Sequence, residues 1–273
     1  MGKQPLVSIV IPTRNSSEYL EIVLGSIKRK DYENIEIIVV DNNSLDHTKE
    51  IARQYTDRIY NVGPERSSQK NFGARQAQGV YILFLDSDAE LTKDIIRECA
   101  QLGEEGYDMV IVPERHIGSG FWTKAKALER QCFLNDDTVE APWFFRKESF
   151  LAVLGYDENM FAGEDWDLFE RMKRQGFKYT RNKSFINHHL GRLKFWSMVK
   201  KKFYYGKNIS VFMSKNNQVL IRKVPLFRQS YFRNWRLLFR HPILTAGFIF
   251  LKLGETFFVS LGIINYKMNK FKK

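Results

Sequence analysis

Two aspartates separated by one residue follow a very apolar stretch of the chain. Asp86 and Asp88 come directly after residues 80–85, which read Val-Tyr-Ile-Leu-Phe-Leu. Carboxylate oxygens are the ligands that Mg²⁺ and Mn²⁺ prefer, and such an ion also binds phosphate oxygens. The pair therefore predicts a divalent-cation site that stabilises a leaving diphosphate, whereas the alternative for the same triplet is a solvated turn.

Three other groups of polar residues have types suited to chemistry. Asp41 ends the apolar run 35–40, where it can accept hydrogen bonds from a base or ribose or simply form a turn. Glu164 and Asp165 follow a glycine at the start of a predicted helix, so they serve either as helix-capping acids or as a general base. His188 and His189 follow a predicted strand at 184–186, and imidazole is a ligand for Mn²⁺-like ions.

Alternating strands and helices position these residues. Short β-branched or apolar runs predict strands at 7–12, 35–40, 59–62, 80–85 and 109–112, and helical spacing predicts helices from residue 20 and at 48–55, 67–78 and 91–103. The order predicts an α/β fold, with a Rossmann-like, mostly parallel sheet flanked by helices on both faces. Ligands of such sheets bind beyond the carboxyl ends of the strands, where the aspartates above are expected. Neither a P-loop nor a G-x-G-x-x-G motif is present.

Charge divides the chain unevenly. The net charge is +12, but residues 190–273 contain 18 lysines and arginines and one acid, while residues 1–189 are mildly acidic. The cysteines Cys99 and Cys132 predict two buried thiols in a reducing compartment. No basic segment followed by a long apolar stretch begins the chain, so the catalytic part is expected to stay in the cytoplasm.

The basic C-terminal part also contains many apolar residues. Aromatic side chains alternate with lysines at 194–215, which is typical of a helix at a membrane interface, or of a helix packed on the catalytic domain. Residues 243–264 are long enough to span a bilayer, but Lys252 and Glu255 would each cost roughly 2.5–3.5 kcal/mol at its centre. We therefore predict one or two helices in a single leaflet, followed by a polybasic end at residues 267–273. An anionic membrane surface is the expected partner, and nucleic acid is not.

Four separated motifs appear in a familiar order. They are Ser8-Ile-Val-Ile-Pro-Thr-Arg-Asn15, Val39-Val-Asp-Asn-Asn-Ser-Leu-Asp46, the stretch from Asn71 to Gly79 before Leu83-Phe-Leu-Asp-Ser-Asp88, and Gly163-Glu-Asp-Trp-Asp-Leu168. Together they resemble family 2 glycosyltransferases with the GT-A fold. The resemblance covers roughly residues 5–195.

The resemblance implies a role for each matching residue. Asp41 would contact the nucleobase, and Pro12 and Thr13 would line the nucleotide pocket. Asp86 and Asp88 would hold the ribose and the metal, and His188 would be the third metal ligand, with His189 as an alternative. Asp165 would be the catalytic base, with Glu164 beside it. Arg66 and Lys70 would lie near the sugar-phosphate, unless they are solvated charges on a helix. The implied reaction is inverting. Processive members carry a Q-x-x-R-W motif that this chain lacks, so a single transfer is expected.

The sequence thus predicts a GT-A catalytic domain at 1–190 and a helical, basic, membrane-associating extension at 191–273. The expected activity is Mg²⁺- or Mn²⁺-dependent, non-processive transfer of a sugar from a nucleotide-diphosphate sugar to a glycan or lipid-linked acceptor. The enzyme would be peripheral or monotopic on the cytoplasmic side of the membrane. Two alternatives are a nucleotidyltransferase that makes nucleotide-sugars, and a non-catalytic nucleotide-sugar-binding protein. The former should carry a glycine- and lysine-rich loop after the first strand, and residues 13–16 do not.

Overall fold

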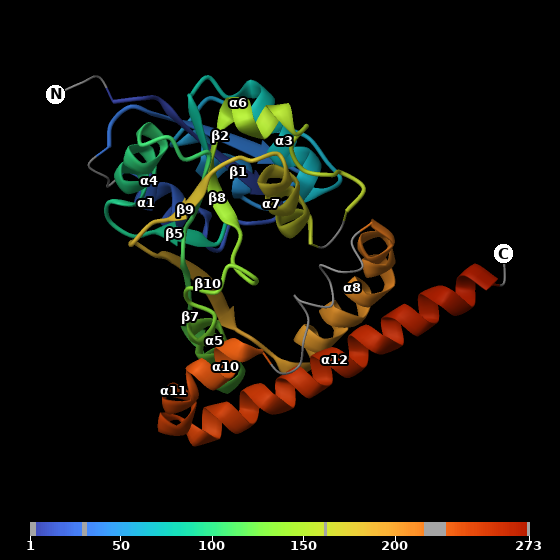
Figure 1. Ribbon diagram of the computed structural model, residues 1–273. Helices are drawn as coiled ribbons and strands as arrows, with labels where there is room; N and C mark the ends of the chain where they lie inside the picture. Colours follow the sequence, from blue (N-terminus) through green and yellow to red (C-terminus); the bar gives the residue numbers. More distant parts are fainter. Residues whose placement is uncertain (1–3, 29–31, 161–162, 216–227, 272–273) are drawn as a thin grey trace. The chain divides into compact units, whose positions relative to one another are not determined.

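The computed structural model describes residues 4–28, 32–160, 163–215 and 228–271 (Figure 1). They form two compact units, each built from separate segments of the chain. Unit 1 comprises Met1–Glu114, Ala141–Glu158 and Glu164–His189, and unit 2 comprises Arg115–Glu140, Asn159–Gly163 and Leu190–Lys273. The phenylalanine and alanine at 161–162, which precede the Gly163 motif, and Lys272 and Lys273 of the predicted polybasic end lie outside the described residues.

Strands and helices largely alternate along the segments that form unit 1, and helices predominate in unit 2. The strands are β1 (Val7–Thr13), β2 (Ile35–Asp41), β3 (Ile59–Asn61), β4 (Tyr81–Phe84), β5 (Ala89–Leu91), β6 (Met109–Ile111), β7 (Glu114–Ser119), β8 (Pro142–Arg146), β9 (Tyr179–Arg181) and β10 (Ile186–Arg192). The helices are α1 (Leu20–Lys28), α2 (Thr48–Arg53), α3 (Arg66–Gln76), α4 (Ile95–Glu104), α5 (Phe121–Cys132), α6 (Lys147–Ala152), α7 (Glu164–Arg174), α8 (Phe195–Lys215), α10 (Gln229–Arg233), α11 (Trp235–Arg240) and α12 (Pro242–Phe271).

A seven-stranded sheet with the order β3-β2-β1-β4-β8-β6-β9 forms the centre of unit 1. Strands β1 to β4 are parallel, β8 is antiparallel to both of its neighbours, and β6 and β9 are parallel. Thr13 at the end of β1 is in register with Asp41 at the end of β2. Val10 of β1 is in register with Phe84, the last residue of β4. The carboxyl ends of these three strands therefore meet at one edge, and the predicted fold class is confirmed.

Alternating side chains of β1 enter two separate cores. Ile9 and Ile11 pack in a cluster with side chains of α1, α2 and α4, whereas Val10 packs in a second cluster with α3, α6 and α7. All three side chains are fully buried. Burial on both faces explains why β1 and β4 read as continuous apolar runs and not as alternating ones. Helices on both faces of the sheet are as predicted.

Two local predictions differ from the structure. The segment predicted as the start of a helix at residue 91 is the end of β5, which pairs antiparallel with β10, and α4 begins only at Ile95. The histidines predicted to follow a strand lie inside β10 itself. A three-stranded sheet with the order β5-β10-β7 results. The pairing of β5 with β10 joins residues about a hundred positions apart, so local periodicity carries no signal for it.

Unit 2 is mostly helical, as predicted for the extension. Helices α8 and α12 lie side by side, and α12 also packs against α5 (Figure 1). The segment from Pro242 to Tyr266 within α12 is long and apolar enough to cross a membrane, by length and composition alone. A C-terminal apolar helix is therefore present.

Helix α3 packs closely on β1 at Gly73. A Cβ atom at this position would lie 2.3 Å from Cγ1 of Val10, so Gly73→Ala should lower the free energy of unfolding by about 1–3 kcal/mol. Gly25→Ala in α1 is the matched control. Its Cβ would meet only the Tyr55 hydroxyl at 3.8 Å, and its helix propensity should raise stability by about 0.5–1 kcal/mol. Urea unfolding of the two variants measures both effects. Equal stability of Gly73→Ala and the native protein would contradict the packing described.

Candidate active site

The ends of β1 and β2 are joined by hydrogen bonds that also hold α3 over them. Oγ1 of Thr13 donates to Oδ1 of Asp41 at 2.9 Å, and the backbone N–H of Ser44 donates to Oδ2 of the same carboxylate at 2.8 Å. Nε2 of Gln69, on α3, donates to the carbonyls of Thr13 and Val40 at 3.0 and 2.6 Å. Gln69 stands in none of the sequence motifs, and its amide fixes the first turns of α3 relative to the strand ends.

The residues expected in the nucleotide pocket lie at this edge, largely inside the protein. Asp41 is fully buried and both of its oxygens accept hydrogen bonds, so contact with a nucleobase would require it to exchange a partner. Pro12 is buried within β1. Their roles in nucleotide binding stay predictions. Asp46 accepts hydrogen bonds from the N–H groups of Ser17 and Thr48 at 3.0 and 3.1 Å, a bonding pattern that fits a structural role at the start of α2.

Asp86, Asp88 and His188 converge beyond the end of β4. One donor atom from each lies within 4.8 Å of the others. The two aspartates occupy the turn between β4 and β5, and His188 reaches them because β10 pairs with β5 at Ala89. Nε2 of His188 lies 3.1 Å from Oδ1 of Asp88. Two carboxylates and one imidazole suit Mn²⁺ or Mg²⁺ and leave coordination positions for phosphate oxygens.

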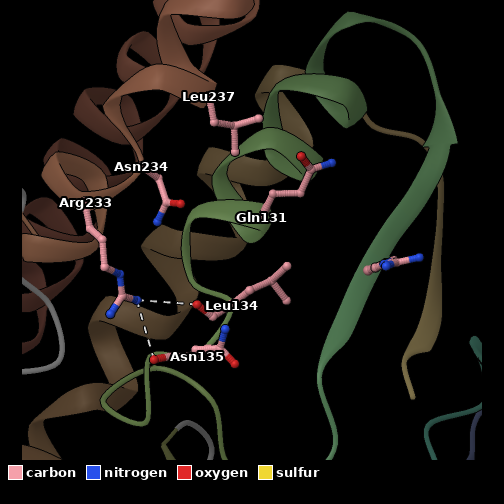
Figure 2. Close-up of a pocket in the computed structure, with 7 residues that line it drawn as sticks. Gln131, Leu134, Asn135, Arg233, Asn234 and Leu237 are labelled. Atoms are coloured by element: carbon pink, nitrogen blue, oxygen red, sulfur yellow. Dashed lines mark hydrogen bonds between the residues drawn. The ribbon is translucent and has the colours of Figure 1, made fainter. Parts of the chain in front are cut away.

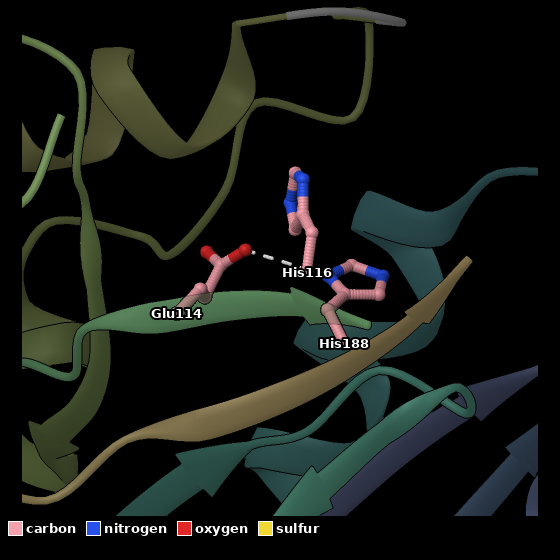
Figure 3. A group of neighbouring side chains, drawn as sticks. All are labelled: Glu114, His116 and His188. Atoms are coloured by element: carbon pink, nitrogen blue, oxygen red, sulfur yellow. Dashed lines mark hydrogen bonds and ion pairs between the residues drawn. The ribbon is translucent and has the colours of Figure 1, made fainter. Parts of the chain in front are cut away.

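Glu114 orients the imidazole of His188. Its Oε2 lies 3.4 Å from Nδ1 of His188, and Figure 3 shows the two side chains extending toward each other from neighbouring strands. Burial disfavours the charged imidazole, but the bonds to Asp88 and Glu114 outweigh it and raise the pKa of His188 to about 10. A carboxylate on the second nitrogen is the usual support of a metal-binding histidine. Glu114 belongs to no motif, so the sequence offered no signal for it.

The neighbouring histidine faces a different set of residues. The ring of His189 stacks on Tyr19 with centroids 5.3 Å apart, and its Nε2 lies 3.1 Å from Oε2 of Glu90. Consecutive residues of a strand point to opposite faces, which separates the two histidines. The geometry therefore favours His188 over His189 as the partner of the two aspartates.

Two cations one turn apart on α3 pair with two different carboxylates. Nη1 of Arg66 lies 3.3 Å from Oδ2 of Asp86, and Nζ of Lys70 lies 3.3 Å from Oδ1 of Asp165. The Arg66 side chain is 59% exposed, whereas that of Lys70 is 7% exposed. Burial raises the pKa of Asp86, but the positive charges of Arg66, Lys70 and His188 outweigh this effect, so the pKa is lowered. Helix α3 thus carries an accessible cation beside the predicted metal site and a buried one beside the predicted base.

Tyr156 completes the surroundings of Asp165 and was not found from the sequence. Its hydroxyl group hydrogen-bonds to Asp165, and burial together with that carboxylate raises the pKa of Tyr156 well above its ordinary value. Nζ of Lys70 lies 4.9 Å from the centre of its ring. The side chain of Asn71 holds the loop by accepting from the Tyr156 N–H at 2.9 Å and donating to its carbonyl at 2.8 Å. Only Asn71, inside a recognised motif, gave a sequence signal for this arrangement.

Glu164 and Asp165 occupy the first turn of α7, directly after Gly163, whose φ is +80°. Burial and the charge of Asp165 raise the pKa of Glu164 to about 7. The Asp165 side chain is 43% exposed, so a hydroxyl group from solvent or substrate can reach it. An accessible carboxylate held by a lysine and a tyrosine is suited to accept a proton from such a hydroxyl.

Solved structures with a similar fold include sugar transferases. The mannosyltransferase PcManGT from Pyrobaculum calidifontis, in complex with GDP-Man and Mn²⁺, matches with a TM-score of 0.60 and 15% identity over 96% of this chain and 74% of that one. S. aureus TarS, residues 1–349, matches with a TM-score of 0.55 and 15% identity over 96% of this chain and 91% of that one. At these identities the likeness shows the fold.

A curated relative shares more of the sequence. GalNAc(5)-diNAcBac-PP-undecaprenol beta-1,3-glucosyltransferase from Campylobacter jejuni is 32% identical over 59% of this chain and 57% of that protein. The chain therefore spans little more than half the length of this relative. The sequence pattern of glycosyl transferase family 2 matches residues 8–235, which is most of the chain. The resemblance noted in the four motifs is confirmed, and this protein belongs to glycosyl transferase family 2.

Proposed function

We propose that this glycosyltransferase is inverting and metal-dependent, and that it transfers one sugar from a nucleoside diphosphate sugar to a lipid-linked or polymeric glycan acceptor. The observation that carries the proposal is the convergence of Asp86, Asp88 and His188 at the strand ends, with α3 carrying cations to both Asp86 and Asp165. Incubation with a panel of nucleotide-sugars and Mn²⁺ or Mg²⁺, followed by measurement of released nucleoside diphosphate, tests the activity and identifies the donor.

The donor side of the reaction rests on the cluster at the end of β4. Asp86, Asp88 and His188 would hold the divalent ion, which supplies charge neutralisation for the leaving diphosphate. Arg66 is largely exposed beside Asp86, where its guanidinium group can turn to a phosphate oxygen. Glu114 keeps Nε2 of His188 directed at the aspartates. These residues bind and orient the group that departs.

The acceptor side rests on Asp165. In a single displacement, the acceptor oxygen bonds to the sugar carbon as the bond from that carbon to the phosphate oxygen breaks on the opposite face, which inverts the configuration. The carboxylate of Asp165 accepts the proton of the attacking hydroxyl, and the nucleoside diphosphate leaves. Lys70 and Tyr156 hold the carboxylate in place. No second carboxylate is needed as a nucleophile, since the acceptor attacks directly.

The acceptor class is supported by what related proteins are named for. The Campylobacter jejuni relative is named for a PP-undecaprenol-linked glycan, and the S. aureus relative TarS for poly(ribitol-phosphate). Unit 2 of this chain carries an apolar helix able to contact a membrane, where a lipid-linked acceptor would be found. A peripheral or monotopic position on the cytoplasmic side is part of the proposal.

Loss of a metal ligand should abolish transfer. Asp88→Asn removes one of two carboxylates from the cluster, so we expect the rate with Mn²⁺ to fall at least about 100-fold, and EDTA to abolish the native rate. Glu90→Gln is the matched control, because Glu90 lies two residues further along the chain, in β5, but bonds to His189. Its rate should stay within about threefold of native by the same argument. A native rate that is unchanged in EDTA would exclude the metal-dependent reaction.

Loss of the base should separate catalysis from binding. Asp165→Asn should lower kcat by about 10²–10⁴-fold, because an amide cannot accept the hydroxyl proton. Affinity for nucleoside diphosphate, measured by calorimetry, should be unchanged, and this outcome also separates a catalytic protein from a nucleotide-sugar-binding one. Glu170→Gln, on the same helix and paired with Lys173, is the control. Transfer by Asp165→Asn at the native rate would show that another base acts.

The decrease of kcat/KM at low pH should depend on Glu164. Since the pKa of Glu164 is raised to about 7, the pair of carboxyl groups takes up a proton as the pH falls through that value. When Glu164 and Asp165 already share a proton, Asp165 accepts the proton of the acceptor hydroxyl less readily. We therefore expect kcat/KM to fall below about pH 7. In Glu164→Gln the repelling charge is gone, and the fall should shift to lower pH. An identical pH profile in both proteins would contradict this.

A further inference from the structure

Helix α12 is held along one side by the rest of unit 2. A Cβ atom at Gly206 of α8 would lie 2.3 Å from the carbonyl oxygen of Val259, so the two backbones nearly touch there. Gly254 of α12 packs against Phe195 of α8, and Gly247 packs against Phe121 of α5. Three contacts spread over the helix show that α8 and α5 lie along it and not merely at one end.

The two charges in the middle of α12 belong to this packed side. Lys252 and Glu255, the only charged residues between Pro242 and Tyr266, meet Lys126 and Glu129 of α5. Lys126 lies 2.7 Å from Glu129 and 3.4 Å from Glu255, and Lys252 lies 3.2 Å from Glu255 and also contacts Glu129. The carboxylates are almost fully buried. Cations and anions alternate in this four-residue cluster, so each buried charge has a partner of opposite sign.

The opposite side of α12 is apolar and exposed. Its residues recur at helical spacing: Ile243, Ile249, Phe250, Leu253, Phe257, Leu261 and Ile264. Phe257, near the middle, is 60% exposed. We refer to these seven residues as the apolar stripe. A continuous exposed stripe of this kind, without charge, marks a surface that binds another apolar phase.

The short helices α10 and α11 extend the apolar stripe. Their polar side is fixed to the end of α5: Nη2 of Arg233 donates to the carbonyls of Leu134 and Asn135 at 3.4 and 3.5 Å, and Asn234 donates to that of Cys132 at 3.1 Å. Figure 2 shows these side chains around a pocket of about 810 Å³.

On their other side, α10 and α11 expose aromatic rings beside α12. Phe232, Trp235 and Phe239 are 67%, 52% and 76% exposed. They line an apolar groove of about 750 Å³ together with residues of α12, including Ile249 and Leu253 of the apolar stripe. Residues 228–241 contain four arginines and no acid. An apolar groove bordered by cations matches the hydrocarbon and the anionic headgroups of one leaflet.

We propose that α12 lies in the plane of the membrane, with the apolar stripe and the aromatic side of α10–α11 inserted into one anionic leaflet. The contacts on the packed side of α12 exclude a position in which α12 crosses the bilayer. Passage of α12 through the bilayer would carry the α5 ion cluster and the exposed Lys200 and Lys201 of α8 into hydrocarbon. The charges that oppose a transmembrane helix are those that hold it flat on unit 2. This inference rests on the membrane position under the proposed function but not on the sugar transfer.

Vesicle binding tests the surface. The full chain should bind sedimenting vesicles of phosphatidylcholine with phosphatidylglycerol more tightly than phosphatidylcholine alone. Phe257→Glu should lower the partition coefficient at least about tenfold, because it places a charge in the apolar stripe. Leu154→Glu is the matched control, since Leu154 is 87% exposed on unit 1 and should bind as native. Native-like binding by Phe257→Glu would overturn the proposal, as would a lipid-free dimer that Phe257→Glu dissociates.

Thiol labelling tests the orientation. His241→Cys and Tyr266→Cys place reactive groups near the two ends of α12, at exposed positions outside the apolar stripe, and the native cysteines Cys99 and Cys132 are buried. With an impermeant reagent, both positions should react in sealed inverted membrane vesicles and neither in intact cells. Reaction of one position in cells and the other in inverted vesicles would show a spanning helix and overturn the in-plane arrangement. A wholly soluble protein would overturn membrane contact itself, while nucleotide release by the same preparation reports separately on sugar transfer.

Discussion

Carboxylates that share a site repel one another and are costly to bury unless cations lie among them. Unit 1 gathers Asp86, Asp88 and Asp165 around the strand ends and meets this constraint with Arg66, Lys70 and His188. Two of these cations come from a single helix, and the third comes from a strand that belongs to the smaller sheet. The placement of α3 and β10 brings this positive charge to the carboxylates. A donor diphosphate would bring more negative charge, and the same groups are available to balance it.

Much of the fold was predictable because the buried strands are unusually uniform. Residues 7–12, 35–40 and 80–85 are short runs made mostly of β-branched, leucine and aromatic residues, and their side chains pack on both faces of the sheet. Such runs are typical of buried strands. The aspartates at their ends were predictable for the same reason, since strand ends locate the ligand edge. The small sheet of β5, β7 and β10 was not predictable, because its three-residue strand β5 depends on a partner about a hundred residues away.

The supporting residues of the site were also out of reach of the sequence. Glu114, Tyr156 and Gln69 act on His188, Asp165 and the strand ends through contacts that link distant segments. None stands in a pattern whose spacing suggests chemistry. Lys252 and Glu255 show the same limit from the other side. Counted along the sequence they weaken a membrane helix, although their spacing lets them pair with each other, and only the position of α5 shows that each also meets an opposite charge on another helix.

Because both units are built from separate segments of the chain, a C-terminal truncation removes only part of unit 2. Unit 2 contains residues 115–140, which lie between two segments of unit 1. A protein truncated at residue 190 would keep α5 but lose α8 and α12, so Lys126 and Glu129 would keep their bond to each other and lose their second partners, Glu255 and Lys252. In the truncated protein, the apolar surface of α5 that α12 covers would be exposed, and the protein would tend to aggregate. We therefore expect that deletion of residues 191–273 would not give a soluble enzyme, and that detergent or lipid added to the full chain would keep it in solution.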